Sequence, residues 1–155
     1  MCPPKRGKTT FERFQSGPRN DELSVQYLER LFELVEAEPN LGVRYNPGGI
    51  AITLRGPNGK IGPASLLTLG HPGVIKLHTW SLNNNLEKRM SKVVANRIHQ
   101  AHEQGMLELF GADVVKGEMN VMSGEPHIST CVGGIEALLH LIVSTTRAVE
   151  AETGL

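Results

Sequence analysis

Three side chains with binding chemistry alternate along one predicted strand, residues 74–80. Lys76, His78 and Trp80 share a face, because successive side chains of a strand point to opposite sides. They offer a cation, a titratable imidazole and the only tryptophan of the chain. This face is a candidate binding site for a ligand or partner. The same pattern also fits a half-exposed sheet face that is covered at one end by Trp80.

A further cation falls within a predicted helix that spans residues 85–109. On a helical wheel Arg97 lies near the middle of the apolar face. A buried guanidinium needs a carboxylate or a bound anion beside it, unless its charged end extends past the edge of the core. Arg97 is therefore a candidate binding residue, and a structural ion pair would explain it as well. The face comprises Leu86, Met90, Val93, Val94, Ile98 and Ala101.

The same helix carries His99 and His102, followed by Glu103. Zinc-binding helices of the H-E-x-x-H type place their histidines four residues apart with the glutamate between them. Here the histidines are three residues apart, the glutamate lies outside the pair, and the wheel turns His99 toward solvent. We therefore expect no metal site and no cofactor.

The last predicted helix, residues 135–152, has a polar stripe opposite a broad apolar face. The stripe contains Glu136, His140, Ser144 and Arg147. Side chains stacked along one helix do not converge on a substrate as a catalytic triad must, so a solvated or interface stripe is expected. We expect no catalytic residue here. Cys131, just before this helix, has no basic cluster beside it in the sequence and is expected to be a buried thiol.

Composition narrows the class of protein. The chain has 155 residues, 39% of them apolar, which is enough for a core in one domain. Its 16 basic and 16 acidic side chains cancel, which argues against attraction of the whole protein to nucleic acid or an anionic membrane. No segment approaches the roughly 20 apolar residues of a membrane span. The two cysteines form no CxxC pair, which favours a reducing, cytoplasmic location.

The first 19 residues form a predicted flexible basic tail, separate from a single domain at 20–155. They are rich in proline, glycine and cations, and Glu12 is their only acidic residue. Such a segment is either a nucleic-acid- or partner-binding arm or a solvated tail. The candidate nucleic-acid-binding residues are Lys5, Arg6, Lys8 and Arg13.

An α+β fold is predicted for the domain. A helix at 20–38 precedes a block of short apolar strands at 41–81, which glycine- and proline-rich turns separate. The helix at 85–109 follows, then strands at 114–122 and 127–132, then the helix at 135–152. The order is α-βββ-α-ββ-α, which predicts an antiparallel sheet of about five strands packed with three main helices.

This element order resembles that of type III secretion chaperone-like and YbjN-like proteins over most of residues 20–152. The resemblance implies a small helix-on-sheet domain that dimerises and binds partner proteins. The order also resembles small accessory domains attached to predicted restriction-type nucleases. The best strands carry no carboxylate, and Glu118 has no lysine two residues on, so a metal nuclease is disfavoured.

Three function classes follow from the sequence. The leading one is a non-enzymatic protein-binding, adaptor or chaperone-like domain that forms a homodimer through the helix at 135–152 or a sheet edge. The second is a nucleic-acid-associated protein that uses the basic tail and the face of Lys76, His78 and Trp80. The third is a small enzyme with a site near Arg97, His78 and His127.

Overall fold

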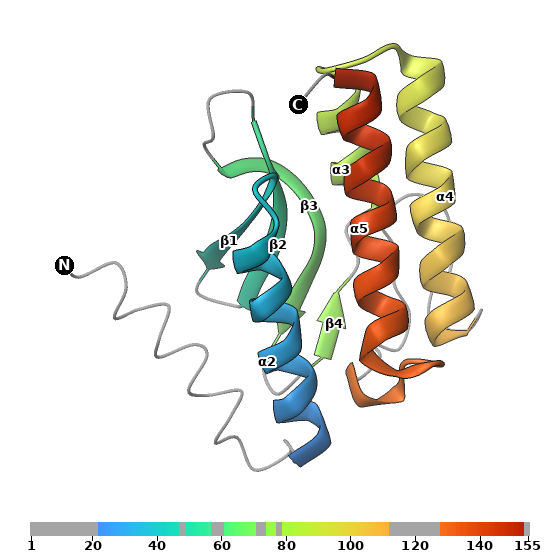
Figure 1. Ribbon diagram of the computed structural model, residues 1–155. Helices are drawn as coiled ribbons and strands as arrows, with labels where there is room; N and C mark the ends of the chain where they lie inside the picture. The colour runs from blue at the N-terminus through green and yellow to red at the C-terminus, as the bar shows by residue number, and fades with distance from the viewer. Residues whose placement is uncertain are drawn as a thin grey trace, which may run out of the picture.

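The computed structural model describes residues 22–46, 49–56, 61–70, 74–76, 79–111 and 128–153. An antiparallel sheet lies beside a group of helices, which confirms the predicted α+β class (Figure 1). The predicted basic tail and the predicted strand at 114–122 lie outside the described residues. The elements in chain order are α2 (Glu22–Ala37), β1 (Leu41–Asn46), β2 (Gly49–Arg55), β3 (Ile61–Gly70), β4 (Val74–Lys76), α3 (Thr79–Leu86), α4 (Lys92–Phe110), a 3₁₀ turn (Ile128–Thr130) and α5 (Gly134–Thr153).

The sheet is a meander in the order β1-β2-β3-β4, with every neighbouring pair antiparallel. Since β4 has only three residues, β1, β2 and β3 make up most of it. Val43 pairs with Ile52, and Ile52 pairs with Leu67. Consecutive residues of β2 from Ile50 to Leu54 are at most 2% exposed. This central strand is thus covered on both faces.

The core joins the sheet to one side of each helix. In α2 the buried residues are Leu28, Leu31 and Val35, at the three- and four-residue spacing of one helical face. In α5 they include Ile135, Leu138, Leu139, Ile142 and Val149. Full burial of one such side chain contributes about 1.5–3 kcal/mol, so these two faces account for much of the packing energy. Both helices match their predicted ranges to within a few residues.

Two ion pairs connect α2 to α5. The Arg30 guanidinium donates two hydrogen bonds to the Glu136 carboxylate, at 3.1 and 2.9 Å. More than two turns further along, Arg147 of α5 lies 2.8 Å from Glu38, the residue that follows α2. The paired residue numbers rise together, so α2 and α5 run in the same direction, as Figure 1 shows. Two residues of the polar stripe, Glu136 and Arg147, therefore connect α5 to α2 and to the residue that follows it.

The predicted helix at 85–109 includes the end of one helix and nearly all of a second. The first, α3, begins at Thr79 and ends at Leu86, so the strand predicted to reach Trp80 ends at Lys76. Leu82 and Leu86 are fully buried, one turn apart, and this packing outweighs the poor helix propensity of the asparagines between them. The second, α4, begins after Ser91, whose hydroxyl accepts a hydrogen bond from the Val94 amide.

The predicted sheet of about five strands is not found: the described part of the chain contains four strands, β1 to β4. The segment predicted as a strand at 127–132 forms a 3₁₀ turn at Ile128–Thr130 and then an irregular turn. Gly133 and Gly134 follow with positive φ angles of 83° and 78°, which only glycine adopts readily. They turn the chain straight into α5. Of the described helices, none is long and apolar enough to cross a membrane.

Candidate functional site

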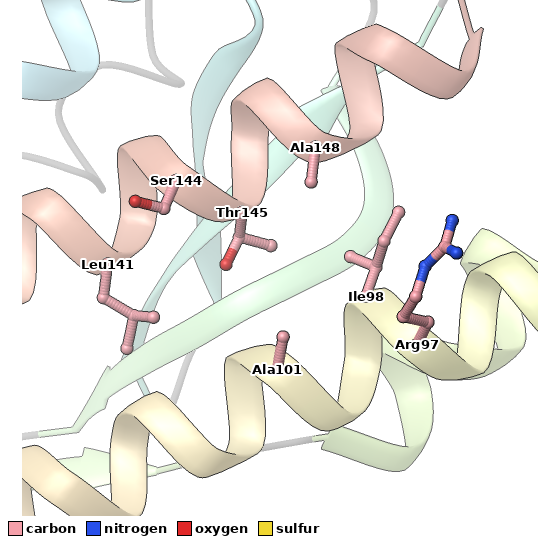
Figure 2. A pocket seen from close by; sticks show the side chains of 7 residues that line it. All are labelled: Arg97, Ile98, Ala101, Leu141, Ser144, Thr145 and Ala148. Atoms are coloured by element: carbon pink, nitrogen blue, oxygen red, sulfur yellow. The ribbon is translucent and has the colours of Figure 1, made fainter.

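A pocket of about 240 Å³ lies between α4 and α5 (Figure 2). Three of its seven lining residues, Ala101, Ser144 and Ala148, have side chains too short to fill the gap between the helices. Ile98 and Thr145 are buried at its base, whereas Ala101 and Ser144 are exposed at its mouth. The remaining lining residues are Arg97 and Leu141. The pocket is therefore a mostly apolar hollow that opens on the protein surface.

The two helices that form the pocket are antiparallel and approach closely at one end. Gly105 of α4 lies against Leu141 of α5, so closely that a Cβ atom at Gly105 would meet the Leu141 side chain. Toward Arg97 the lining includes the short side chains of Ala101 and Ala148, beside Ile98 and Arg97 itself. A glycine contact at one end and alanines at the other thus explain why the pocket exists and where it opens.

Buried His102 joins three elements next to the pocket. It is 1% exposed, and its Nε2 atom lies 3.0 Å from the Leu66 carbonyl oxygen of β3. Its Nδ1 atom lies 2.7 Å from the Thr145 hydroxyl of α5. A carbonyl only accepts hydrogen bonds, so Nε2 must carry a proton, and in the neutral ring Nδ1 then accepts a hydrogen bond from the Thr145 hydroxyl. These two partners fix the tautomer of the neutral imidazole.

Burial sets the charge of His102. It lowers the pKa of His102 to about 4, because the charged imidazolium would lose its solvation. The hydrogen bond to Leu66 opposes this shift, and nearby His99 adds to it. The imidazole is consequently neutral at neutral pH.

Thr145 and His102 also have the arrangement of a nucleophile and its base, with the Leu66 carbonyl as the orienting group. Thr145 lines the pocket, so a ligand in the pocket could reach its hydroxyl group. However, a general base works best when its pKa is near the working pH, and the pKa of His102 lies far below it. The pair is better explained as a buried polar link between β3, α4 and α5.

Arg97 does not lie in the middle of the buried face of α4, so the wheel prediction was wrong. The buried residues are Ala95, Ile98, His102 and Met106, while Val93 is 77% exposed. Arg97 is exposed and stands at the Ala148 end of the pocket (Figure 2). No ion pair of Arg97 is found among the described residues. Its predicted binding role stays a prediction, now attached to a defined pocket.

His99 does not face solvent, which corrects a second prediction from the wheel. Its side chain is 13% exposed and lies 3.6 Å from Glu103, one turn further along α4. Burial lowers the pKa of His99, and the Glu103 carboxylate opposes this shift. The described residues contain no group of three or more histidine, cysteine, aspartate or glutamate side chains placed to hold a metal ion.

Most other predicted binding residues lie outside the described part of the chain. This holds for the side chains of Lys76 and Trp80, for all of His78 and His127, and for the basic tail residues Lys5, Arg6, Lys8 and Arg13. The four residues of the polar stripe of α5 are exposed, but Glu136 and Arg147 form ion pairs with Arg30 and Glu38, and Ser144 lines the pocket. Cys131 is buried, which confirms the prediction of a buried thiol, and burial raises its pKa to about 11.

Sequence reasoning missed His102 and Thr145, the polar pair at the base of the pocket. A signal was present, because Ala95, Ile98, His102 and Met106 follow three- and four-residue spacings.

The chain matches no family model, and neither the curated proteins nor the solved structures contain a match for it.

Proposed function

We propose that the protein is a non-enzymatic binding protein, and that its α4–α5 pocket holds an apolar side chain of a bound protein segment. The observation that carries this proposal is the lining of the pocket. Its walls are aliphatic apart from two hydroxyl groups and one guanidinium. Apolar walls with a few polar groups are typical of binding sites, in which burial supplies affinity and the polar groups orient the ligand.

The size of the pocket suits one side chain. Apolar cavities of about 150 Å³ take up benzene, so a volume of about 240 Å³ is sufficient for a leucine or phenylalanine side chain. Pockets for drug-sized small molecules hold about 300–1,000 Å³ and bury most of the ligand surface. The exposed Ala101, Ser144 and Arg97 leave this pocket open. A protein segment would cover the opening with its own backbone, which a free small molecule does not do.

The polar groups of the pocket favour binding over catalysis. The Thr145 hydroxyl donates a hydrogen bond to His102. The pKa of His102 is about 4, so His102 is a weak base at neutral pH. The lining contains no carboxylate, thiol or imidazole. The enzyme alternative would have to rest on His78 and His127, and the nucleic-acid alternative on the basic tail and the Lys76 face. No described observation favours either of them.

A homo-oligomer in the cytoplasm completes the proposal. Among the described strands β1 and β4 lie at the sheet edges, and an unpaired edge is where a second chain can add a strand. The exposed side of α5 is less suited, because Glu136 and Arg147 already pair with α2. Light scattering of the full chain tests this part, and a strict monomer at all concentrations would contradict it.

Peptide selection tests the binding function directly. The full chain is used to select from a random peptide display library, and the strongest peptide is added to ¹⁵N-labelled protein. We expect selected peptides to share a large apolar residue, and the amides of Ile98, Ala101, Thr145 and Ala148 to shift most. A peptide whose largest shifts fall on α2 or on the sheet would contradict a site between α4 and α5.

A further inference from the structure

Arg97 stands at one end of the apolar pocket and carries its only charge. In Figure 2 the side chain extends from α4 at the Ala148 end, while Leu141 closes the other end. From Leu141 to Ala148 the pocket wall spans seven residues of α5, or about 10 Å at 1.5 Å per residue. An occupant of that length therefore contacts apolar side chains along most of the pocket and the Arg97 guanidinium at one end.

Two carboxylates of the helices that form the pocket pair with residues other than Arg97. On α5, Glu150 pairs with Arg147 and accepts a hydrogen bond from Asn40, which holds it on the side of α2 and β1. On α4, Glu103 lies beside His99, on a different side of the helix from Arg97. Among the described residues no ion pair of Arg97 is found, so its guanidinium stands at the end of the pocket without a carboxylate partner there.

We propose that the pocket selects protein segments in which an acidic side chain lies within one helical turn of an apolar anchor, with Arg97 binding the carboxylate. The inference rests on the proposed function and adds the charge of the partner. A guanidinium offers a planar fork of donors that matches a carboxylate, and a covering segment would remove water from the pair. The apolar anchor gives affinity, whereas Arg97 fixes the direction and the charge preference of the segment.

Matched peptides test the charge preference. The selected apolar peptide is synthesised with Glu, Gln or Lys placed up to four residues to either side of its anchor, and binding to the full chain is measured by fluorescence polarisation. At the best position we expect Glu to bind about tenfold more tightly than Gln, the size of one hydrogen bond to a charged group. Lys should bind more weakly than Gln.

Charge-changing substitutions at Arg97 separate recognition by this residue from a general effect of the charge of the protein on peptide binding. The variant Arg97→Glu should invert the order, so that the Lys peptide binds best, and Arg97→Gln should remove the preference. The control Lys92→Glu reverses an exposed cation on the same helix outside the pocket lining and should keep the preference for Glu. Equal binding of the three peptides by the wild-type protein would overturn the inference.

Other outcomes distinguish this inference from the proposed function. If binding of every peptide is unaffected by Ala148→Leu, which fills the pocket, the proposed function itself fails. If Ala148→Leu binds no peptide but the three peptides bind equally to the wild type, only the charge preference fails. Hexanoate that binds as tightly as the Glu peptide would show a free acid as the ligand. A change of oligomeric state in Ala148→Leu would show a second copy as the occupant. Either result overturns the inference.

Discussion

The Thr145 hydroxyl donates a hydrogen bond of 2.7 Å to Nδ1 of His102, so one side chain both lines the α4–α5 pocket and fixes the buried imidazole. The Leu66 carbonyl holds the other ring nitrogen at 3.0 Å. Since both nitrogens are satisfied inside the core, the pair stabilises the fold and orients the base of the pocket at the same time.

Removal of the Thr145 hydroxyl should destabilise the protein. In Thr145→Val the Nδ1 atom of His102 loses its partner while buried, and an unsatisfied buried polar group costs about 1–3 kcal/mol. Urea unfolding at pH 7 measures the loss. Thr145→Ser keeps the hydroxyl and should recover part of it. Ser144→Ala, on an exposed neighbour, should stay within about 0.5 kcal/mol of wild type. Equal stability of the Val and Ser variants would contradict the hydrogen bond.

Stability should fall when the pH drops below the pKa of an unfolded histidine. The pKa of His102 is about 4 in the folded protein and near 6.5 when unfolded, so the unfolded chain binds the proton more readily. The contribution of His102 is fully present above pH 6.5 and is lost as the pH falls toward 4. Its size is on the order of 3 kcal/mol. Burial lowers the pKa of His99 as well, which adds to the loss.

Two measurements check this pH dependence. NMR titration of the His102 ring protons should show a midpoint near 4, and a midpoint at or above 6 would contradict the burial of a neutral ring. Urea unfolding at pH 7 and pH 5 should show a smaller pH effect in His102→Gln than in the wild type. Carboxylates titrate in both proteins, so the difference between the two isolates the histidine.

Gly105 and Leu141 should be energetically coupled. Gly105→Ala gains about 1 kcal/mol of helix propensity, but its new methyl group meets the Leu141 side chain, so the net gain in the wild type should be smaller. In a Leu141→Ala background the full gain should appear. A double-mutant cycle by urea unfolding should give a coupling of at least about 0.5 kcal/mol. Additive effects would show that the helices do not touch at this point.

Cys131 should react slowly with alkylating agents. Its pKa of about 11, raised by burial, leaves about a hundredfold less thiolate at pH 8 than the usual value of 9 would give. Iodoacetamide labelling of a Cys2→Ser variant, followed by mass spectrometry, measures the rate. Labelling should become fast in urea. Rapid labelling of the folded protein would contradict the buried position of Cys131.

Sequence patterns predicted the outer helices and the first strands of the block, but not the end of the block at Thr79. In α2 and α5 the apolar residues are long aliphatic side chains at regular helical spacing, and Pro39 and the pair Gly133–Gly134 mark the ends. In β2, isoleucines alternate with smaller residues between two turns. These signals are local, so one sequence is sufficient to find them.

The middle of the chain depends on contacts that a local pattern does not contain. The asparagines of α3 favour turns, yet Leu82 and Leu86 pack into the core and hold a helix there. Because this helix and α4 were joined on one wheel, the buried face was assigned in the wrong rotation. Val93 was placed inside and His99 outside. Burial of His102 further requires partners from β3 and α5, which no spacing within α4 reveals.

The central claim is that the α4–α5 pocket holds an apolar side chain of a partner segment, and a filled pocket tests it most directly. Ala148→Leu places a larger side chain in the available volume without introducing a poor helix former, so the fold should keep its stability. Ala151→Leu adds the same side chain at an exposed position of α5, three residues along. Calorimetric titration with the strongest selected peptide compares the two. We expect binding to be lost in Ala148→Leu and unchanged in Ala151→Leu, whereas equal binding by both stable variants would contradict the account.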